Sequence, residues 1–376
     1  MQLKRLCVDG VRNLQQVDLE FNAGRSDADL GDDRVSSSHL NLVLGANGSG
    51  KSSLLESIHL LAHGRSFRSG APDDLVQRGA SGLDIHSHWS VGTGQSQRLG
   101  MSRRDRSWHL RVNDADVASL AEFVQHSAAV AVTPDSQLLV TGPAEWRRRH
   151  LDWLLFHVEH EFLDHWRRYQ RALKQRNLVL RSHGDSESLA AWEAQMASAG
   201  EAVSRFRAQA LALLEQQFRQ LAGLLIPSLA VDGLLFRPGW PSALSLAEAL
   251  AAGRESDQER GFSQRGPHRA DWRLRFADGL DQDQLSRGQA KLVAICCLLA
   301  QVKVFHAQRG IWPVMLVDDL ASELDPEHQV RLLGWLAQTQ AQIFITGTEL
   351  QPRWPDRMIA AAARFHVEQG RVTRLL

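Results

Sequence analysis

The most constraining feature of this chain is an eight-residue stretch, Gly45-Ala46-Asn47-Gly48-Ser49-Gly50-Lys51-Ser52, which matches the pattern G-x-x-x-x-G-K-[ST]. It follows a short apolar strand pattern at 40–44 and precedes a helical pattern from Ser52 to about Ala62 that ends near Gly64. Glycines let backbone N–H groups turn toward phosphate oxygens, and the helix N-terminus adds a favourable dipole. A glycine-rich turn before an ordinary helix is the alternative, and the full match with both flanks disfavours it. We therefore expect an α/β core that binds ATP or GTP.

Individual residues of this loop are expected to contact a nucleotide in different ways. Lys51 can reach the β- and γ-phosphates and is predicted to be catalytic, while Ser52 is predicted to ligate Mg²⁺. The predicted phosphate-binding set is Gly45, Ala46, Asn47, Gly48, Ser49, Gly50, Lys51, Ser52 and Ser53.

A second candidate site is the apolar strand pattern at 314–317, which ends in Asp318 and Asp319. A strand that ends in two carboxylates suits a magnesium ligand followed by a water-activating base. We assign Asp318 to the metal and Asp319 to the attacking water. Taken alone, the pattern is more often a strand that ends in a polar turn. The following residues, Leu320 to Asp325, are similar to the D-loop of ABC-type ATPases, which places Asp325 in the predicted nucleotide site.

The third candidate site is Leu285-Ser286-Arg287-Gly288-Gln289, which precedes a long helical pattern. Ser286 is a candidate N-cap, and a free helix N-terminus attracts phosphate. Capped helices are usually structural, but this stretch lies just upstream of the acidic strand and resembles the ABC signature motif. The resemblance implies that Ser286, Gly288 and Gln289 contact the γ-phosphate bound to a second protomer, and hence that an ATP-dependent homodimer forms.

Composition limits where a nucleic acid or a membrane could bind. Lys+Arg and Asp+Glu both number 43, so a DNA site must be a local patch. The three cysteines lack metal-ligand or disulfide spacing, and the first ten residues do not read as a signal peptide. The longest apolar run, Leu292 to Val302, is shorter than the ~20 residues of a membrane-spanning helix. We expect a buried helix there, a cytoplasmic location and no membrane contact.

The remaining pattern predicts a nucleotide-binding core interrupted by helices. An antiparallel strand pair is expected near the N-terminus, short strands between Leu83 and Val112, and a strand at 342–346. Helical periodicity predicts two long helices that form an antiparallel arm, with a shorter helix after them. The ranges are 3–8 and 17–21 for the strand pair, 144–181 and 189–225 for the long helices, and 246–252 for the short one. The polar segment 24–39 is predicted to be a surface loop.

We therefore predict an ABC-type P-loop ATPase head, with a mixed sheet plus an antiparallel β part, and an inserted α-helical arm domain. The head is assigned to residues 1–125 and 263–376, and the arm to residues 126–262.

Further motifs distinguish between the branches of this ATPase class. Transport ATPases carry a glutamate after the strand-end aspartate and a histidine after the next strand, whereas this chain has Asp319 and Ile345-Thr346-Gly347-Thr348. The insertion is too short for the coiled coils of SMC proteins. The chain resembles the RecF family in four further motifs, which follow in the expected order: 64–69 (GRSFRS), 146–152 (WRRRHLD), 174–177 (KQRN) and 266–268 (GPH). The resemblance weakens at 24–39 and in parts of 227–261.

The resemblance to RecF implies an ATP-dependent dimer that binds double-stranded DNA and favours junctions with single-strand gaps. It also implies RecR and RecO as partners, RecA as an indirect partner, and roles in DNA repair, replication and the SOS response. A weak, DNA-stimulated ATPase would serve as the switch. Two other classes remain open: the ATPase subunit of a membrane transporter, and a small-molecule kinase that acts as a monomer.

Candidate DNA contacts are Arg65, Arg68, Arg147 and Arg148. The segment 144–183 carries nine Lys/Arg against five acidic residues, a surplus that could track phosphates, although a solvated helix face is equally common. The nine are Arg147, Arg148, Arg149, Arg167, Arg168, Arg171, Lys174, Arg176 and Arg181. The role of His268 stays open.

Overall fold

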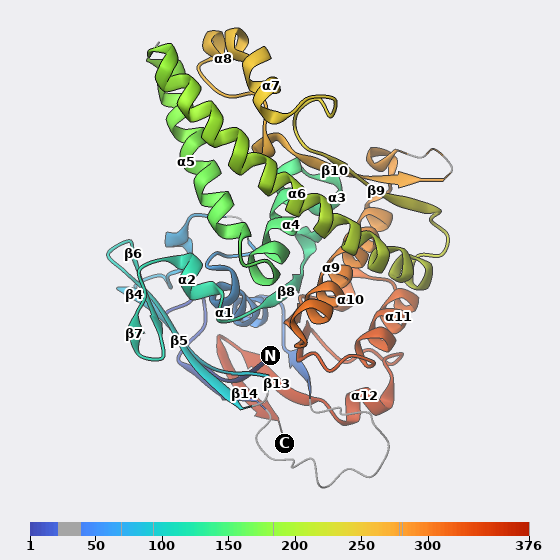
Figure 1. Ribbon diagram of the computed structural model, residues 1–376. Coiled ribbons are helices and arrows are strands. Elements are labelled where there is room, and N and C mark those ends of the chain that lie inside the picture. The colour runs from blue at the N-terminus through green and yellow to red at the C-terminus, as the bar shows by residue number, and fades with distance from the viewer. Residues whose placement is uncertain are drawn as a thin grey trace. The chain divides into compact units, whose positions relative to one another are not determined.

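The computed structural model describes residues 1–21, 39–68, 70–92, 94–182, 184–277, 279 and 281–375 (Figure 1). The chain divides into two compact units, Met1–Ser136 with Phe305–Leu376, and Gln137–Val304. The first unit is therefore built from both ends of the chain. The predicted surface loop at 24–39 lies outside the described residues except for His39.

A six-stranded sheet of the first unit carries the predicted nucleotide motifs. Its order is β14 (Arg371–Leu375), β13 (Ala363–Glu368), β3 (Leu40–Leu44), β12 (Ile343–Gly347), β11 (Val314–Val317) and β8 (Ala129–Val132). All neighbours are parallel except β14, which runs antiparallel to β13. The strands predicted at 40–44 and 314–317 are confirmed, and the one predicted at 342–346 lies one residue later. Because β3, β11 and β12 are parallel, their carboxyl ends meet at one sheet edge.

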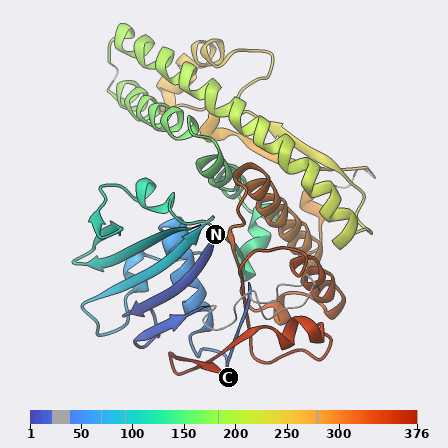
Figure 2. The same ribbon diagram turned by 60° about the horizontal axis from the view of Figure 1, so that its bottom comes forward.

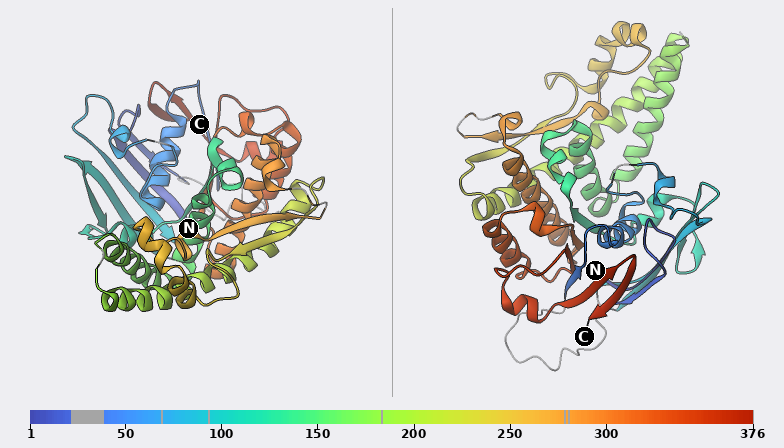
Figure 3. Two further views of the ribbon diagram at one scale, coloured as in Figure 1. Left: turned by 90° about the horizontal axis from the view of Figure 1, so that it is seen from above. Right: turned by 180° about the vertical axis from the view of Figure 1, so that it is seen from behind.

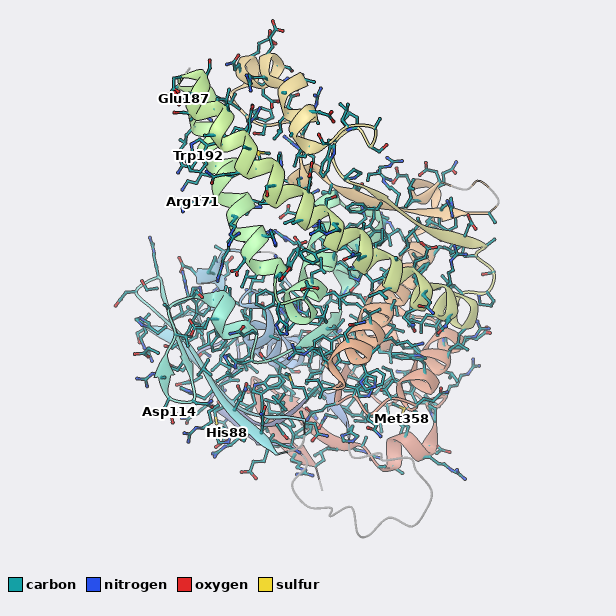
Figure 4. The ribbon with its side chains drawn as sticks, in the orientation of Figure 1. His88, Asp114, Arg171, Glu187, Trp192 and Met358 are labelled. Carbon is teal, nitrogen blue, oxygen red and sulfur yellow. The ribbon has the colours of Figure 1, made fainter. Side chains whose placement is uncertain are left out.

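The second sheet of this unit is antiparallel, in the order β2 (Val17–Glu20), β1 (Gln2–Asp9), β4 (Gly82–Val91), β5 (Gln95–Arg104), β6 (Ser107–Val112) and β7 (Ala115–Asp116) (Figure 2). The predicted N-terminal strand pair is confirmed, with Val8 opposite Val17. Along β4, Ile85 and Trp89 are buried while His88, labelled in Figure 4, is exposed. This alternation is typical of a strand with one face on the core.

Helix α1 (Lys51–His63) joins the two sheets through one hydrophobic core. Leu54 and Ile58 of α1 belong to the same buried cluster as Leu6 of β1 and Leu316 of β11. The helix ends as predicted, because Gly64 adopts a left-handed conformation and its N–H donates to Leu60 O.

The second unit is mainly helical. Its elements are α3 (Leu138–Thr141), α4 (Ala144–Val158), α5 (Phe162–Arg181), α6 (Ser186–Leu225), β9 (Val231–Arg237), α7 (Leu246–Ala252), α8 (Arg254–Arg260), β10 (Asp271–Phe276) and α9 (Arg287–Arg309), which continues into the first unit. Helices α5 and α6 pack side by side (Figure 3). The short helix predicted at 246–252 is confirmed, and Ser245 and Glu248 form its capping box.

The single helix predicted for 144–181 is wrong. Helix α4 ends at Val158, Glu159 is extended with φ −120° and ψ 108°, and α5 begins at Phe162. The linking residues Glu159, His160 and Glu161 supply no apolar side chain to continue a buried stripe. No proline marks this break, so helical periodicity alone did not reveal it.

The second unit extends to Val304, so it includes residues that the sequence analysis assigned to the head. The predicted arm ended at residue 262, but strand β9 lies before this position and strand β10 lies after it, and the two strands pair antiparallel. His150 of α4 also bonds α9, since its Nε2 lies 3.2 Å from Cys297 O and its own carbonyl accepts from Gln301 Nε2 at 2.8 Å. These interactions attach residues 263–304 to the inserted helices.

Helix α9 contains the longest apolar run of the chain. Val293 to Cys297 are buried, which confirms the buried helix predicted for this run. The helix is long and apolar enough to cross a membrane, but 67% of its most apolar window is buried within the protein. The core helix of a globular protein can have the same length and apolar character, so this feature is weak evidence for a membrane span.

Candidate nucleotide-binding site

The P-loop, Gly45–Ser52, connects the carboxyl end of β3 to the N-terminus of α1. Gly45, Gly48 and Gly50 have φ values of 157°, 76° and 118°, which glycine adopts without a steric penalty. A Cβ atom at Gly45 would lie 2.2 Å from Val367 O, so only glycine fits there. The loop is fixed at both sides of this turn, because Gly45 N–H donates to Gly347 O at 3.2 Å and Gly370 N–H donates to Ser49 O at 2.8 Å.

The centre of the loop is suited to bind phosphate. Ala46, Asn47 and Gly48 are exposed, so their backbone groups are accessible. The hydroxyl of Ser49 is buried and has no hydrogen-bond partner among the described residues. A buried hydroxyl without a partner is costly, and an oxygen acceptor of a ligand would satisfy it. The loop therefore fits the phosphates of a nucleotide.

The ammonium group of Lys51 lies beneath the loop. Lys51 is only 8% exposed, and its Nζ donates to Gly45 O at 2.8 Å and to Ala46 O at 2.9 Å. Burial lowers the pKa of Lys51, and the charges of Asp319 and Asp318 oppose that shift. The structure thus brings the predicted lysine and both predicted carboxylates into one electrostatic neighbourhood.

The two carboxylates at the end of β11 are held differently. Asp318 is 5% exposed, its N–H donates to Val132 O at 2.8 Å, and its Oδ1 accepts from Thr346 Oγ1 at 2.8 Å. Asp319 has φ 53° and ψ 51°, a left-handed conformation that is uncommon outside glycine and frequent at functional sites. The chain turns sharply there into α10 (Leu320–Glu323). Thr346, which sequence reasoning did not select, orients both residues.

The structure shows how Mg²⁺ would be held if it binds with a nucleotide. Among the described residues no group of three or more His, Cys, Asp or Glu side chains could form a metal cage. Magnesium usually binds through one or two protein ligands together with phosphate oxygens and water. Ser52 and Asp318 supply a hydroxyl and a carboxylate of this kind, so they fit such a site.

Asp325 of the predicted D-loop caps α11 (Pro326–Leu336). Its Oδ1 accepts from the N–H groups of Glu327 at 3.0 Å and His328 at 3.1 Å, and its Oδ2 lies 2.6 Å from His328 Nδ1. Desolvation favours a higher pKa for Asp325, but the hydrogen bonds from His328 and Glu327 outweigh it, so the pKa of this carboxyl is lowered. A contact of Asp325 with nucleotide stays a prediction.

The signature-like stretch forms the capped N-terminus of α9 in the second unit. Ser286 Oγ accepts from Gln289 N–H at 3.2 Å, and Gln289 Oε1 accepts from Ser286 N–H at 2.9 Å. Ser286, Gly288 and Gln289 are exposed, and a Cβ at Gly288 would meet no atom within 4 Å. A surface-exposed helix N-terminus of this kind can accept an anion from another molecule.

Sequence reasoning missed several residues beside the P-loop. Asn13 Nδ2 donates to Gly48 O at 2.8 Å, and Asn13 Oδ1 accepts from Ser53 Oγ at 2.9 Å. Both residues line a cavity of about 770 Å³, together with Arg12, Arg68, Asp74 and Arg78. Its volume is typical of small-molecule sites. Arg12, Asn13, Asp74 and Arg78 come from segments with no recognised motif, so only the fold brings them close to Ser53 and Arg68, which the sequence analysis had selected.

The four candidate DNA contacts differ in accessibility. Arg65 is exposed, and Arg68 lines the cavity with Nη1 3.7 Å from Glu56 Oε2. Arg148 is partly buried and donates to Ala270 O at 2.8 Å; burial and the charge of Arg207 lower its pKa.

Arg147 does not fit the predicted role in DNA binding. It is 3% exposed, its Nε and Nη2 donate to Asp271 at 2.6 and 3.1 Å, and its Nη1 donates to three backbone carbonyls. All three guanidinium nitrogens are therefore engaged within the protein. We no longer count Arg147 among the candidate DNA contacts.

Several of the basic residues counted in 144–183 lie together on one exposed face of α5. Arg176 is buried against Glu193 and Asp257, and Arg149 pairs with Glu145. Arg181 is exposed and its Nε donates to Gly261 O at 3.2 Å. Four other cations are also exposed, and in the described part of the chain none of them pairs with a carboxylate: Arg167, Arg168, Arg171 and Lys174. Their spacing places them on one side of the helix, on which Figure 4 labels Arg171. Asp164 lies at the N-terminal end of this face. We call these four residues the α5 basic face.

The P-loop between β3 and α1 and the acidic end of β11, which lies two strands away in the same sheet, define a P-loop ATPase head of the ABC type. A family model described as RecF/RecN/SMC N terminal domain matches residues 2–351. The chain belongs to the RecF family of DNA replication and repair proteins.

Curated relatives support this assignment over the full length. The DNA replication and repair protein RecF of Xanthomonas euvesicatoria pv. vesicatoria is 45% identical over 90% of this chain and 93% of the relative. The RecF protein of Xanthomonas axonopodis pv. citri is 42% identical over 100% of this chain and 99% of the relative.

Solved structures show the same fold. The structure of the recombination mediator protein RecF with ATP in the RecFOR pathway has a TM-score of 0.85 at 24% identity, and covers 100% of this chain and 97% of that chain. The Smc head domain with an extended coiled coil, bound to the C-terminal domain of ScpA derived from Pyrococcus furiosus, has a TM-score of 0.56 at 15% identity. It covers 99% of this chain and 96% of that chain. The predicted fold class and the resemblance to RecF are confirmed.

Proposed function

We propose that this chain is an ATP-switched DNA-binding protein of recombinational repair and replication-fork maintenance. Two protomers would bind ATP between them and close on duplex DNA near single-strand gaps, which helps to load the recombinase. The observation that carries this proposal is that one chain presents two separate features suited to bind phosphate. One is the P-loop with its adjacent carboxylates, and the other is the exposed, capped helix N-terminus at Ser286.

The proposed ATP site is the P-loop together with the cavity beside it. The exposed loop backbone supports phosphate binding, as does the Ser49 hydroxyl, which has no partner among the described residues. The cavity lined by Asn13 and Ser53 has room for the nucleoside. Ser52 and Asp318 would hold Mg²⁺, which supplies charge neutralisation at the phosphates when bound. Lys51 would release its two loop carbonyls to reach the phosphates, and Asp319 would accept a proton from the attacking water.

The switch follows from a γ-phosphate that two protomers share. Ser286, Gly288 and Gln289 of one protomer would contact the nucleotide held by the other, with Asp325 nearby. ATP then has a higher affinity for the closed dimer than for separate protomers, which a two-state switch requires. Because the closed state is the useful one, we expect weak turnover, below the roughly 1–100 s⁻¹ typical of kinases.

The proposed DNA contact is the α5 basic face, with Arg65, Arg68 and Arg148 as further candidates. Unpaired, exposed cations at helical spacing neutralise phosphates and release counterions, and this contributes most of sequence-independent DNA affinity. The zero formal net charge of the chain makes a local basic face more informative than it would be in a basic protein. DNA bound there would stimulate ATP turnover.

The proposed partners and location follow from family membership. We propose RecR and RecO as direct partners, RecA as an indirect one, and participation in the SOS response in the cytoplasm. The solved relative with ATP is described as part of the RecFOR pathway, which supports the choice of partners.

Sedimentation velocity tests the proposed ATP switch. Wild-type chain should sediment as a monomer without nucleotide and as a dimer with Mg-ATP. Ser286→Arg should bind a fluorescent ATP analogue like wild type but remain monomeric, because the new side chain occupies the partner's phosphate position. A wild-type sedimentation coefficient that does not respond to ATP, or a Ser286→Arg variant that dimerises normally, would overturn the proposal.

A further inference from the structure

Glu56 is a buried carboxylate in the middle of the P-loop helix α1, and no motif assigns it a role. Its side chain is 0% exposed. Ionised carboxylates are rarely buried unless cations and hydrogen-bond donors satisfy them. Within the described residues Glu56 has three partners: Arg12, whose Nε and Nη2 donate to it at 3.1 and 2.9 Å, the hydroxyl of Ser66, and Arg68 at 3.7 Å.

The first branch of this network fixes the turn that follows β1. Arg12 has a φ of 53°, a left-handed conformation that costs energy for a residue with a side chain. The turn persists because Arg12 is held at several points. Its N–H donates to Leu75 O at 2.7 Å, its Nη1 donates to Asp74 O at 2.8 Å, and its other nitrogens donate to Glu56.

This turn sets the position of the next residue, Asn13, against the P-loop. Asn13 Nδ2 donates to the carbonyl of Gly48, the exposed glycine at the loop centre, and Asn13 Oδ1 accepts from Ser53 Oγ. A shift of the Arg12 turn would therefore move the amide that holds the loop. Glu56 thus acts on the phosphate loop through Arg12 and Asn13.

The second branch holds the segment after α1 at the wall of the nucleotide cavity. Ser66 Oγ donates to Glu56, and Ser66 Oγ in turn accepts from the Arg68 N–H at 2.8 Å. The guanidinium groups of Arg12 and Arg68 line the same cavity as Asn13 and Ser53. One carboxylate of α1 therefore holds both the Arg12 turn and the segment that carries Ser66 and Arg68, and the two segments meet at this cavity.

We propose that Glu56 is a positioning residue for nucleotide binding, which sets the P-loop through Arg12 and Asn13 and anchors Arg68 at the cavity wall. This inference rests on the proposed binding of ATP. Glu56 itself does not touch the nucleotide. Its removal changes affinity because the loop and the two cavity arginines lose their fixed positions, whereas a purely structural residue would change stability alone.

The test is a double-mutant cycle in the full-length chain, with the dissociation constant of a fluorescent ATP analogue as the readout. Glu56→Gln keeps the shape of the side chain but removes the charge that holds Arg12, and should weaken binding about tenfold or more. Arg12→Gln should weaken binding similarly. The double variant should be little weaker than either single variant, because both changes break the same connection.

Two controls separate positioning from folding. Ser87→Ala removes the buried acceptor of the Trp89 Nε1–H bond in the antiparallel sheet, so it should lower the melting temperature while binding stays within twofold of wild type. Asn13→Ala changes an exposed side chain, so it should fold even if Glu56→Gln does not, and it should also weaken binding about tenfold.

Specific outcomes overturn the proposal. It fails if Glu56→Gln and Asn13→Ala bind the analogue within twofold of wild type, or if the losses of Glu56→Gln and Arg12→Gln multiply independently. If Lys51→Ala binds the analogue more weakly than wild type while Glu56→Gln binds it as tightly as wild type, the ATP site stands and only the positioning role is lost. If wild type does not bind the analogue, both proposals fail.

Discussion

The hydroxyl of Thr346, at the end of β12, donates to Asp318 Oδ1 at 2.8 Å. The oxygen of the same hydroxyl accepts from the Asp319 backbone N–H at 2.7 Å. One side chain on the neighbouring strand thus fixes the rotamer of the proposed magnesium ligand and the turn of the proposed general base. Partners of this kind commonly matter for metal affinity nearly as much as the ligands do.

The first prediction concerns this hydroxyl. Thr346→Val keeps the shape of the side chain but leaves the Asp319 N–H without its acceptor, so the free energy of unfolding should fall by about 1–3 kcal/mol. Magnesium-dependent ATP turnover should fall about 10–100-fold, as expected for a lost outer partner of a metal ligand. Chemical denaturation and a steady-state phosphate-release assay measure the two effects. Thr339→Val, which removes a hydroxyl bonded to Leu336 O, is the control. Turnover that falls no more than in Thr339→Val would contradict the assigned role.

The second prediction separates binding from hydrolysis. Asp319→Asn removes the proposed base but keeps the left-handed turn, which asparagine tolerates. ATP turnover should fall about 10²–10⁴-fold, the usual contribution of a general base. ATP-dependent dimerisation should persist and the dimer should last longer, because hydrolysis no longer opens it. Phosphate release and sedimentation in the same buffer measure both, and wild-type turnover in Asp319→Asn would remove this residue from the mechanism.

The third prediction concerns the α5 basic face. Changing Arg167, Arg168, Arg171 and Lys174 to glutamine should weaken DNA binding and make the slope of log K against log salt shallower by about 0.9 for each phosphate that is no longer neutralised. A control is Arg219→Gln with Arg275→Gln, which removes two exposed cations of the same unit that pair with Glu215 and Asp232. Titrations at several salt concentrations measure the slope. Equal slopes for the two variants would place the DNA site elsewhere.

The fourth prediction is a loss of stability in mild acid that depends on His150. Burial lowers the pKa of His150 to about 4 from 6.5, and its Nδ1 has no hydrogen-bond partner among the described residues. Because the unfolded chain binds the proton more readily than the folded one, stability should fall as pH drops from 6.5 toward 4. From pH 7 to pH 5 this group should contribute a loss of about 2 kcal/mol.

Denaturant unfolding of His150→Leu at the two pH values tests the fourth prediction. Between pH 7 and pH 5 the free energy of unfolding of the variant should fall by about 2 kcal/mol less than that of wild type, whatever the stability of the variant at pH 7. A pH dependence identical to that of wild type would show that His150 does not resist protonation.

Local motifs predicted the nucleotide-binding half of the fold accurately. The strand at 40–44, the P-loop and the helix that ends at Gly64 are specified by neighbouring residues, since phosphate-binding turns and helix caps are short-range features. The apolar strand at 314–317 was predicted with the same bounds because it is buried on both faces and reads as a continuous apolar run.

Features that depend on residues distant in sequence could not be predicted. The break between α4 and α5 has no proline or glycine, and strand β8 is a short apolar run that is recognised only through its pairing with β11. Arg147 and Arg167 are both arginines of a helical stretch, yet only the packed structure shows that Asp271 holds the first while the second is exposed. Asn13, Glu56 and Thr346 likewise act through partners that lie far along the chain.

The central claim, that ATP switches DNA binding, is tested most directly by fluorescence anisotropy of a labelled gapped duplex at one fixed salt concentration. Protein is titrated with and without Mg-ATP, because affinities for DNA are comparable only at the same salt concentration. The account predicts clearly tighter binding with Mg-ATP for wild type and no ATP effect for Ser286→Arg. Equal affinity of wild type in both conditions, or no binding in either, would contradict it.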